Sequence, residues 1–210
     1  MALYLDSANI EEARRAKKLG WVYGVTTNPN LMAKAGIPPR EVLVELAALD
    51  FHQVYYQLVS RNMDAMLEEA HQAAELVRSG LVLKVVPTEI GYRFVSEYNS
   101  VFSFCITAVY DAAQALVARE AGARYIAVYV NRATKQIGDG ISLVRELAEV
   151  LSGGQTRIVA ASLKSTKETA AASMAGAQDL TVPFDVLMAL VSHPLSEQTI
   201  EQFNIEGVGI

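Results

Sequence analysis

The sequence predicts an α/β protein, a single-domain (β/α)8 barrel of the TIM type, and three observations support this prediction. Short apolar runs rich in β-branched residues recur eight times, helical segments separate them, and a polar residue follows nearly every run. Parallel strands buried on both faces read as continuous apolar runs, and helices are the usual crossovers between them. We therefore expect one barrel domain over residues 1–210, with a C-terminal helix and tail. The alternative, an open doubly wound sheet, lacks the G-x-G-x-x-G pattern after its first strand.

The expected strands follow one another at short intervals along the chain. In order they are LYLDS (3–7), GVTTN (24–28), VYYQLV (54–59), LVLKVV (81–86), FSFCIT (102–107), YIAVYV (125–130), RIVAAS (157–162) and LTVPF (180–184). The segments with helix signals between them include residues 9–20, 38–49, 63–80, 108–122 and 140–154. Proline stands near a start and glycine just past several ends, as expected of helices. Ala-Gly-Ala precedes two strands, which indicates a weak repeat of βα units with glycine in the left-handed helix cap.

Composition excludes several classes of partner. The chain has 51% hydrophobic and 20% charged residues, enough for a sizeable core, and a net charge of −5. Nucleic-acid and anionic membrane surfaces need clustered Lys and Arg, so we expect neither partner. No secretion signal or membrane-length apolar run is present, and we expect a cytoplasmic protein. Cys105 lies in an apolar run and is expected to be a buried, inert thiol. His52, His71 and His193 are scattered, so we expect no metal or other cofactor.

One lysine interrupts the apolar run LVLKVVPT at residues 81–88. Burying an unpaired ammonium costs several kcal/mol unless the group loses its proton or finds a partner. Burial lowers the pKa of a lysine, and a neutral amine attacks carbonyl groups. We therefore interpret Lys84 as a nucleophile that forms a Schiff base. The structural alternative is a salt bridge from Lys84 to Asp6 across the barrel.

Polar residues at the carboxyl ends of the strands should meet at one mouth of such a barrel. They are Asp6, Thr26, Thr27, Asn28, Gln57, Lys84, Thr107, Tyr129, Asn131, Arg132, Ser162 and Lys164. Arg132 and Ser162 are suited to anchor a phosphate. Lys164 is either a third residue that binds this phosphate or a solvated loop lysine. For Asn28, Thr107 and Asn131, turn or capping chemistry is an equal alternative. Tyr129 shares a face with Tyr125 and Ala127, and core packing is its alternative.

The segments LYLDSANI, GVTTNPNLM, LVLKVVPT, ITAVYDAAQAL, AGARYIAVYVNR and VAASLKS resemble, in order and spacing, the small transaldolase family that includes fructose-6-phosphate aldolase. This resemblance implies a barrel of the class I aldolase type, in which Lys84 forms the Schiff base. It also implies that Asp6 and Asn28 contact donor hydroxyls, and that Gln57, Thr107 and Tyr129 hold the catalytic water. By the same resemblance, Thr26 and Ala127 line the pocket, Arg132 and Ser162 bind a phosphate, and the chain forms a ring-like homo-oligomer, a pentamer or decamer.

The expected reaction is the reversible cleavage of fructose 6-phosphate into dihydroxyacetone and glyceraldehyde 3-phosphate. The tyrosine before Val-Asn-Arg, Tyr129, resembles the tyrosine that aldolase members of the family have at this position. A phenol can hold the water that releases free dihydroxyacetone. The alternative is a transaldolase that transfers the dihydroxyacetone unit between sugar phosphates, or handles a related anionic sugar such as a sulfosugar. A third possibility, from another class, is a sugar-phosphate binding protein without catalysis.

Overall fold

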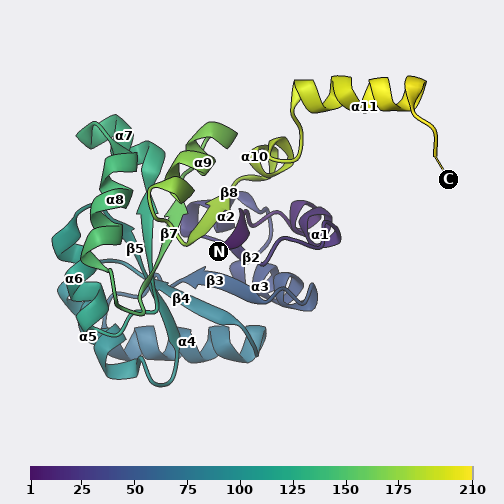
Figure 1. Ribbon diagram of the computed structural model, residues 1–210. Coiled ribbons are helices and arrows are strands. Elements are labelled where there is room, and N and C mark those ends of the chain that lie inside the picture. The colour runs from purple at the N-terminus through teal and green to yellow at the C-terminus, as the bar shows by residue number, and fades with distance from the viewer. Residues whose placement is uncertain (210) are drawn as a thin grey trace.

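The computed structural model describes residues 1–209 and shows a closed barrel of eight parallel strands in the order β1 to β8 (Figure 1). The strands are β1 (Ala2–Asp6), β2 (Gly24–Thr26), β3 (Gln53–Gln57), β4 (Leu81–Val85), β5 (Ser103–Val109), β6 (Tyr125–Tyr129), β7 (Arg157–Ala161) and β8 (Asp179–Val182). The predicted fold class is therefore confirmed, and each expected strand overlaps an observed one.

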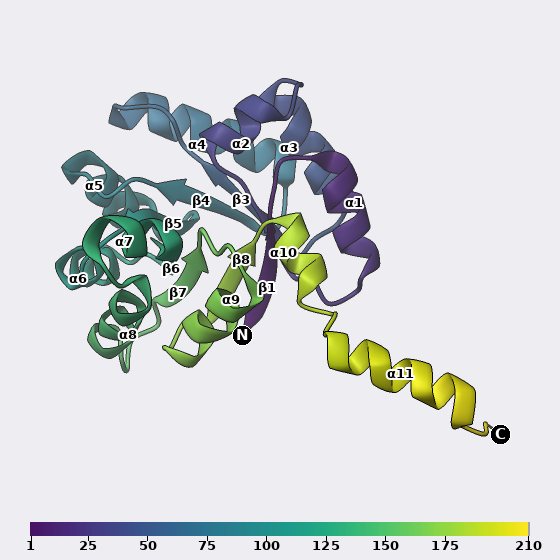
Figure 2. The ribbon, with the colours of Figure 1, turned by 90° about the horizontal axis from the view of Figure 1, so that it is seen from above.

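Helices surround the barrel, as Figure 2 shows from above. They are α1 (Ile10–Lys18), α2 (Pro29–Lys34), α3 (Pro39–Ala48), α4 (Met63–Val77), α5 (Glu89–Tyr98), α6 (Ala112–Glu120), α7 (Val130–Ile137), α8 (Gly140–Val150), α9 (Thr166–Met174), α10 (Phe184–Ala189) and α11 (Pro194–Glu206). No helix among residues 1–209 combines the length and apolar character needed to cross a bilayer.

Strand β4 shows how the pleat divides the core into two parts. Leu83 and Val85 point outward into the large apolar layer between strands and helices. Val82 belongs to a smaller cluster inside the barrel, together with Tyr4, Tyr55, Cys105, Tyr125, Ala127 and Val159. Lys84 lies two residues after Val82 and therefore also faces the interior.

Side chains near the start of several strands fill the amino end of the barrel and are joined by hydrogen bonds. The Tyr4 hydroxyl donates to Gln53 Oε1 at 2.7 Å, and Gln53 Nε2 donates to the Tyr125 hydroxyl at 2.9 Å. Beside them, Arg157 donates to both carboxylate oxygens of the buried Asp179, at 2.6 and 2.7 Å. With this end filled, an interior cavity opens at the carboxyl end of the strands.

Strand β5 extends further than the sequence predicts. The helix expected from residue 108 begins instead at Ala112, where the Asp111 side chain caps it by accepting from the amide of Gln114. The strand continues through a bulge at Ala108, whose φ of 61° lies in the left-handed region. The register shifts there, so Thr107 pairs with Ala127 while Val109 pairs with Val128. Bulges often mark places where a strand re-aims side chains beside a functional site.

The Ala-Gly-Ala turns adopt the predicted left-handed cap. Gly122 has a φ of 84° and Gly176 a φ of 110°. A Cβ atom on Gly122 would also lie 2.6 Å from Asn99 Nδ2, so no larger residue fits without a shift.

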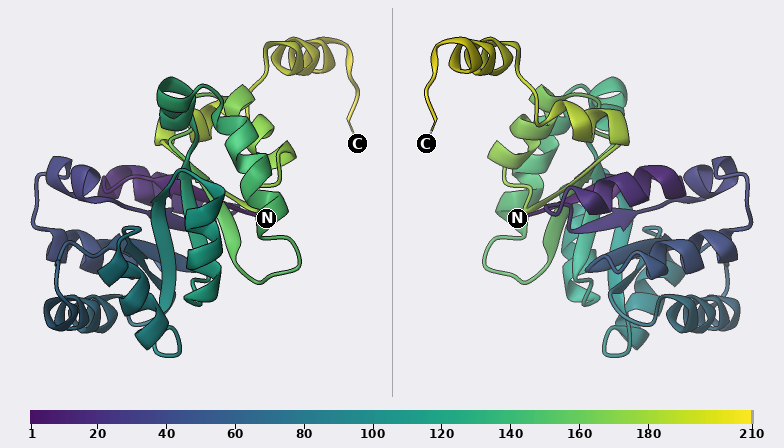
Figure 3. Two further views of the ribbon diagram at one scale, coloured as in Figure 1. Left: turned by 90° about the vertical axis from the view of Figure 1, so that its left-hand side faces the viewer. Right: turned by 90° about the vertical axis from the view of Figure 1, so that its right-hand side faces the viewer.

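The chain ends in a helix that leaves the barrel. Helix α11 extends away from the other elements in every ribbon view, including the two of Figure 3. It begins at Pro194, and the His193 side chain caps it. The predicted C-terminal helix is therefore present. Its apolar side chains Leu195, Ile200 and Phe203 are exposed. The last residue of the predicted tail, 210, lies outside the described residues.

Candidate active site

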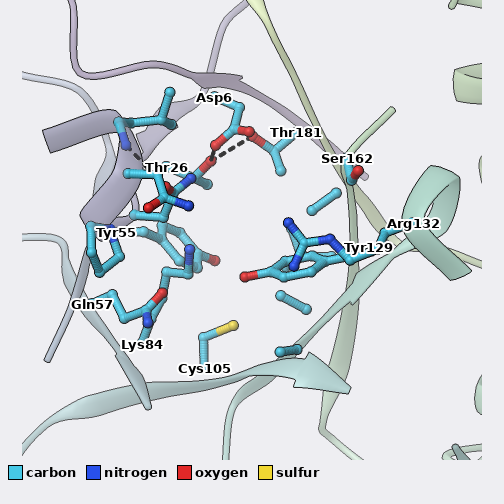
Figure 4. A pocket seen from close by; sticks show the side chains of 18 of the residues that line it. Asp6, Thr26, Tyr55, Gln57, Lys84, Cys105, Tyr129, Arg132, Ser162 and Thr181 are labelled. Carbon is cyan, nitrogen blue, oxygen red and sulfur yellow. Dashed lines mark hydrogen bonds between the residues drawn. The ribbon is translucent and has the colours of Figure 1, made fainter. Parts of the chain in front are cut away.

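A cavity of about 500 Å³ lies at the carboxyl end of the barrel (Figure 4). The predicted site residues that line it are Asp6, Thr26, Asn28, Gln57, Lys84, Ala127, Tyr129, Arg132 and Ser162. The remaining one, Thr107, does not line the cavity itself, but its hydroxyl is hydrogen-bonded to that of Tyr129 at 2.9 Å. The structure thus brings together predicted residues from six strands, β1 to β6, and from the segments that follow β2, β6 and β7.

Lys84 is 5% exposed, and its amine reaches the cavity that it lines. Burial lowers its pKa, and the charge of Asp6 opposes this change only in part. Nζ donates to the carbonyl oxygen of Thr27 at 2.7 Å. Among the ion pairs within residues 1–209, none joins Lys84 to Asp6, so the alternative of a salt bridge is not what the structure shows. The amine is shifted toward its neutral, nucleophilic form.

Asp6 lies at the end of β1, and its carboxyl group faces the same cavity. Burial raises its pKa, while Lys84, the hydroxyl of Thr26 and Lys164 each act in the opposite direction. Thr26 Oγ1 donates to Asp6 Oδ1 at 2.9 Å. A raised pKa makes the carboxylate of Asp6 a stronger base than that of an ordinary aspartate, which favours a role in general acid–base catalysis.

Tyr129 combines packing with polar contacts. Its ring packs edge-on against Tyr110, with centroids 6.2 Å apart, and the Arg132 guanidinium lies 5.0 Å from its centroid. Burial raises the pKa of the phenol, so the hydroxyl keeps its proton. This hydroxyl faces the cavity and pairs with Thr107, which leaves it able to hold a water or a substrate oxygen.

The groups suited to an anion gather on the side of β6 and β7. Helix α7 begins directly after β6 and places Arg132 over the mouth, so Arg132 is a helix residue and not a strand residue. Ser162, with a φ of 59°, turns the chain just after β7. Lys164 is exposed in the loop between β7 and α9, as its alternative as a solvated loop lysine expects, and it also lines the cavity.

Two asparagines at the strand ends have different places. Asn28 lines the cavity, and its Oδ1 also caps α2 by accepting from the amide of Leu31 at 3.0 Å. Asn131 does not line the cavity, and it donates to Glu168 Oε1 at 3.2 Å. Asn28 therefore has both roles: it caps α2, as the alternative expects, and it lines the cavity.

Strand alternation could have identified part of the lining that sequence reasoning missed. Tyr55 precedes Gln57 by two residues, and Cys105 precedes Thr107 in the same way, so each shares a face with a predicted residue. Cys105 is buried as expected, and burial raises the pKa of its thiol to about 12. Thr181 on β8 was missed because it lies within an apolar run. Lys34 was missed because the short helix α2 carries it.

The three histidines have different surroundings in the fold. His52 stacks on Tyr23, His71 packs against Phe102, and His193 caps α11. Within residues 1–209, no three or more His, Cys, Asp or Glu side chains cluster in a way that could hold a metal ion.

Comparison with known proteins identifies the family. The family model described as transaldolase/fructose-6-phosphate aldolase matches residues 3–208. The chain belongs to the transaldolase/fructose-6-phosphate aldolase family. The resemblance drawn from the sequence motifs is therefore confirmed, and the protein is an enzyme of the transaldolase or aldolase type.

Relatives within the family are similar over almost their whole length. A probable transaldolase of Heliobacterium modesticaldum is 38% identical over 206 residues, which are 97% of this chain and 95% of the relative. A probable transaldolase of Alkaliphilus metalliredigens is 36% identical, with 97% of this chain and 96% of the relative covered.

Solved structures of more distant proteins share the fold alone. A mandelate oxidase variant superposes with a TM-score of 0.63 at 18% identity and covers 99% of this chain and 74% of its own. A thiamine phosphate pyrophosphorylase from Pyrococcus furiosus gives a TM-score of 0.61 at 16% identity, with coverages of 87% and 85%.

Proposed function

We propose that this member of the transaldolase/fructose-6-phosphate aldolase family transfers a dihydroxyacetone unit from one sugar phosphate to another through a Schiff base on Lys84. The observation that carries the proposal is a buried amine with a lowered pKa beside a cavity large enough for a sugar phosphate. The names of the similar relatives, probable transaldolases, support transfer over the cleavage of fructose 6-phosphate that the sequence suggested.

The proposed reaction starts when neutral Lys84 Nζ attacks the ketone carbon of the donor and water leaves. The resulting iminium nitrogen keeps one N–H, and the Thr27 carbonyl oxygen, 2.7 Å from Nζ, is placed to accept its hydrogen bond. A hydrogen bond to a cation is among the stronger kinds, so this carbonyl stabilises the charged intermediate.

Asp6 then takes the proton from the donor hydroxyl whose carbon becomes the aldehyde, and the neighbouring carbon–carbon bond breaks. The electron pair of that bond moves to the iminium and leaves an enamine on Lys84. The first aldehyde departs, the enamine carbon attacks the acceptor aldehyde, and Asp6 returns its proton to the new hydroxyl. Water then releases the product ketose from Lys84, with Asn28 and Gln57 holding substrate hydroxyls and water.

The test is incubation with fructose 6-phosphate, with and without erythrose 4-phosphate. For a transferase, glyceraldehyde 3-phosphate forms at a substantial rate only when the acceptor is present. Steady release of free dihydroxyacetone from fructose 6-phosphate alone would contradict the proposal in favour of the lyase. If neither mixture turns over and borohydride traps no adduct with dihydroxyacetone, the chain only binds sugar phosphates.

The lyase stays a second candidate because of one observation. The hydroxyls of Tyr129 and Thr107 lie 2.9 Å apart beside the cavity, where they can hold the water that protonates the enamine. If Tyr129 has this role, Tyr129→Phe should lower the release of free dihydroxyacetone about tenfold or more, because positioned proton transfer contributes about 10²-fold or more to such steps. Transfer to erythrose 4-phosphate should fall much less, since it does not require that proton.

Tyr125→Phe is the matched control for Tyr129→Phe. Tyr125 is also a buried barrel tyrosine, but its hydroxyl accepts from Gln53 at the amino end of the strands. Its loss should leave the ratio of release to transfer unchanged. An unchanged ratio in Tyr129→Phe as well would remove the water-holding role.

Arg132 is proposed to bind the phosphate of the acceptor with Ser162 and Lys164. Arg132→Ala should raise KM for erythrose 4-phosphate about tenfold to a hundredfold, since a hydrogen bond between charged groups contributes about 1.5–3 kcal/mol. The kcat should change less, because the phosphate is remote from the reacting carbons. Unphosphorylated erythrose is the internal control, and an equal loss with both aldehydes would contradict the phosphate role.

We also propose that the protein acts in the cytoplasm as a homo-oligomer on sugar phosphates or a related anionic sugar. The exposed apolar side chains of α11 support assembly, because burying them against another subunit would remove apolar surface from water.

A further inference from the structure

Two threonines flank the strand that carries Asp6. In the closed barrel β1 lies between β2 and β8, with Thr26 beside Asp6 on one side and Thr181 beside Tyr4 on the other. Both threonines face the interior and are almost completely buried, with exposed fractions of 3% and 2%. Figure 4 shows their side chains meeting next to the Asp6 carboxyl group.

The three side chains form a chain of hydrogen bonds with a defined direction. Thr26 Oγ1 donates to Asp6 Oδ1 at 2.9 Å and lies 2.7 Å from Thr181 Oγ1. A threonine hydroxyl has one hydrogen and two acceptor sites. Because the hydrogen of Thr26 goes to the carboxylate, Thr181 must be the donor to Thr26. A hydroxyl that accepts a hydrogen bond is polarised and becomes a stronger donor in turn.

A buried threonine usually satisfies its hydroxyl with a nearby backbone carbonyl. Thr156 does so at the amino end of the barrel, where Oγ1 donates to the carbonyl of Ala123 at 2.8 Å. Thr181 differs because its partner is the side chain that holds the Asp6 carboxylate. Its hydroxyl therefore acts on the charge of Asp6 and does more than fill space.

We propose that Thr181 is a positioning residue that stabilises the ionised form of Asp6 through Thr26, and so sets the pH range in which Asp6 accepts a proton. This inference rests on the proposed role of Asp6 in proton transfer. It adds a residue on β8, the one strand from which sequence analysis drew no site residue.

Other charged groups act on Asp6 from the surrounding elements. Lys84 on β4 and Lys164 after β7 lower its pKa, and Tyr129 on β6 faces it across the cavity. The neighbouring cavity, which Asp6 also lines, carries Glu11, Glu12, Lys34 and Asp185. These groups remain in place when Thr181 is changed, so a difference between variants at Thr181 reports the contribution of its hydroxyl.

Thr181→Val removes the hydroxyl and nearly keeps the shape. The carboxylate of Asp6 is then less stabilised, so the acidic limb of kcat for transfer should move to higher pH. On the acidic side of the profile the rate should fall about threefold to tenfold, the size expected for one hydrogen bond of about 0.5–1.5 kcal/mol, and on the alkaline side it should change little. Thr181→Ser should restore the wild-type profile, and Thr156→Val should leave it unmoved.

Titration of Asp6 by NMR, with carbon-13 in the aspartate carboxyl groups and Asp6→Asn for assignment, separates this inference from the proposed function. A midpoint that moves to higher pH in Thr181→Val, and returns in Thr181→Ser, supports the relay even if the wild type fails to transfer dihydroxyacetone. A midpoint that does not move overturns the relay, whatever the activity. Thr181→Ala supplies the same comparison if the valine variant does not fold.

Discussion

Replacing Lys84 with alanine abolishes the covalent adduct that borohydride traps with dihydroxyacetone, and lowers transfer activity at least about 10⁴-fold. The size follows from the loss of the covalent pathway, since residues that form the intermediate contribute on this scale. In the structure this amine is buried, its pKa is lowered, and it lines the cavity. Mass spectrometry of the reduced protein measures the adduct.

Two further variants make the result specific to this amine. Lys84→Met keeps most of the buried stem, and should be as inactive as Lys84→Ala while leaving a smaller void in the barrel. Lys164→Ala removes the other lysine that acts on Asp6. Borohydride should still trap the covalent adduct at Lys84 in this variant. An adduct that persists in Lys84→Met and disappears in Lys164→Ala would show that Lys164 is the nucleophile.

The barrel could be predicted from the sequence because its evidence is local. Runs such as LVLKVV and YIAVYV carry strand propensity and burial on both faces in a few residues, and glycine at Gly122 marks a helix end without tertiary information. The bulge at Ala108 had no such signal. Alanine has no preference for a positive φ, so tertiary contacts decide that conformation.

The sequence predicts the site residues that stand at recognisable strand ends, but not the contacts that form only when the barrel closes. Lys84 stood out because a charge inside an apolar run is costly. Thr181 did not, because threonine is common in strands and its meeting with Thr26 depends on the closure of β8 onto β1. Likewise, only the structure shows that Lys84 bonds to the Thr27 carbonyl and not to Asp6.

Asp6→Asn should lower kcat for transfer about 10²-fold to 10⁴-fold, the usual range for the loss of a positioned general base. The amide keeps the shape of the carboxyl group but cannot take up the proton from the donor hydroxyl. Borohydride trapping at Lys84 should survive, because the amine does not need Asp6 in order to be neutral. If the variant lost both the trapped adduct and its transfer activity, Asp6 would instead be assigned to the formation of the Schiff base.

The same substitution should change stability in the opposite direction to activity. Because burial raises the pKa of Asp6 in the folded state, its ionised form costs stability at pH above that pKa, and the cost disappears as the carboxyl group is protonated at lower pH. Asp6→Asn should therefore raise the unfolding temperature at pH 8, with a smaller gain as the pH falls through the pKa of the folded-state carboxyl group. Thermal unfolding at several pH values measures this. A gain that does not depend on pH would mean that the amide simply packs better, whereas a gain that fades in acid would show that the barrel keeps a destabilising charge at the position where the reaction needs a base.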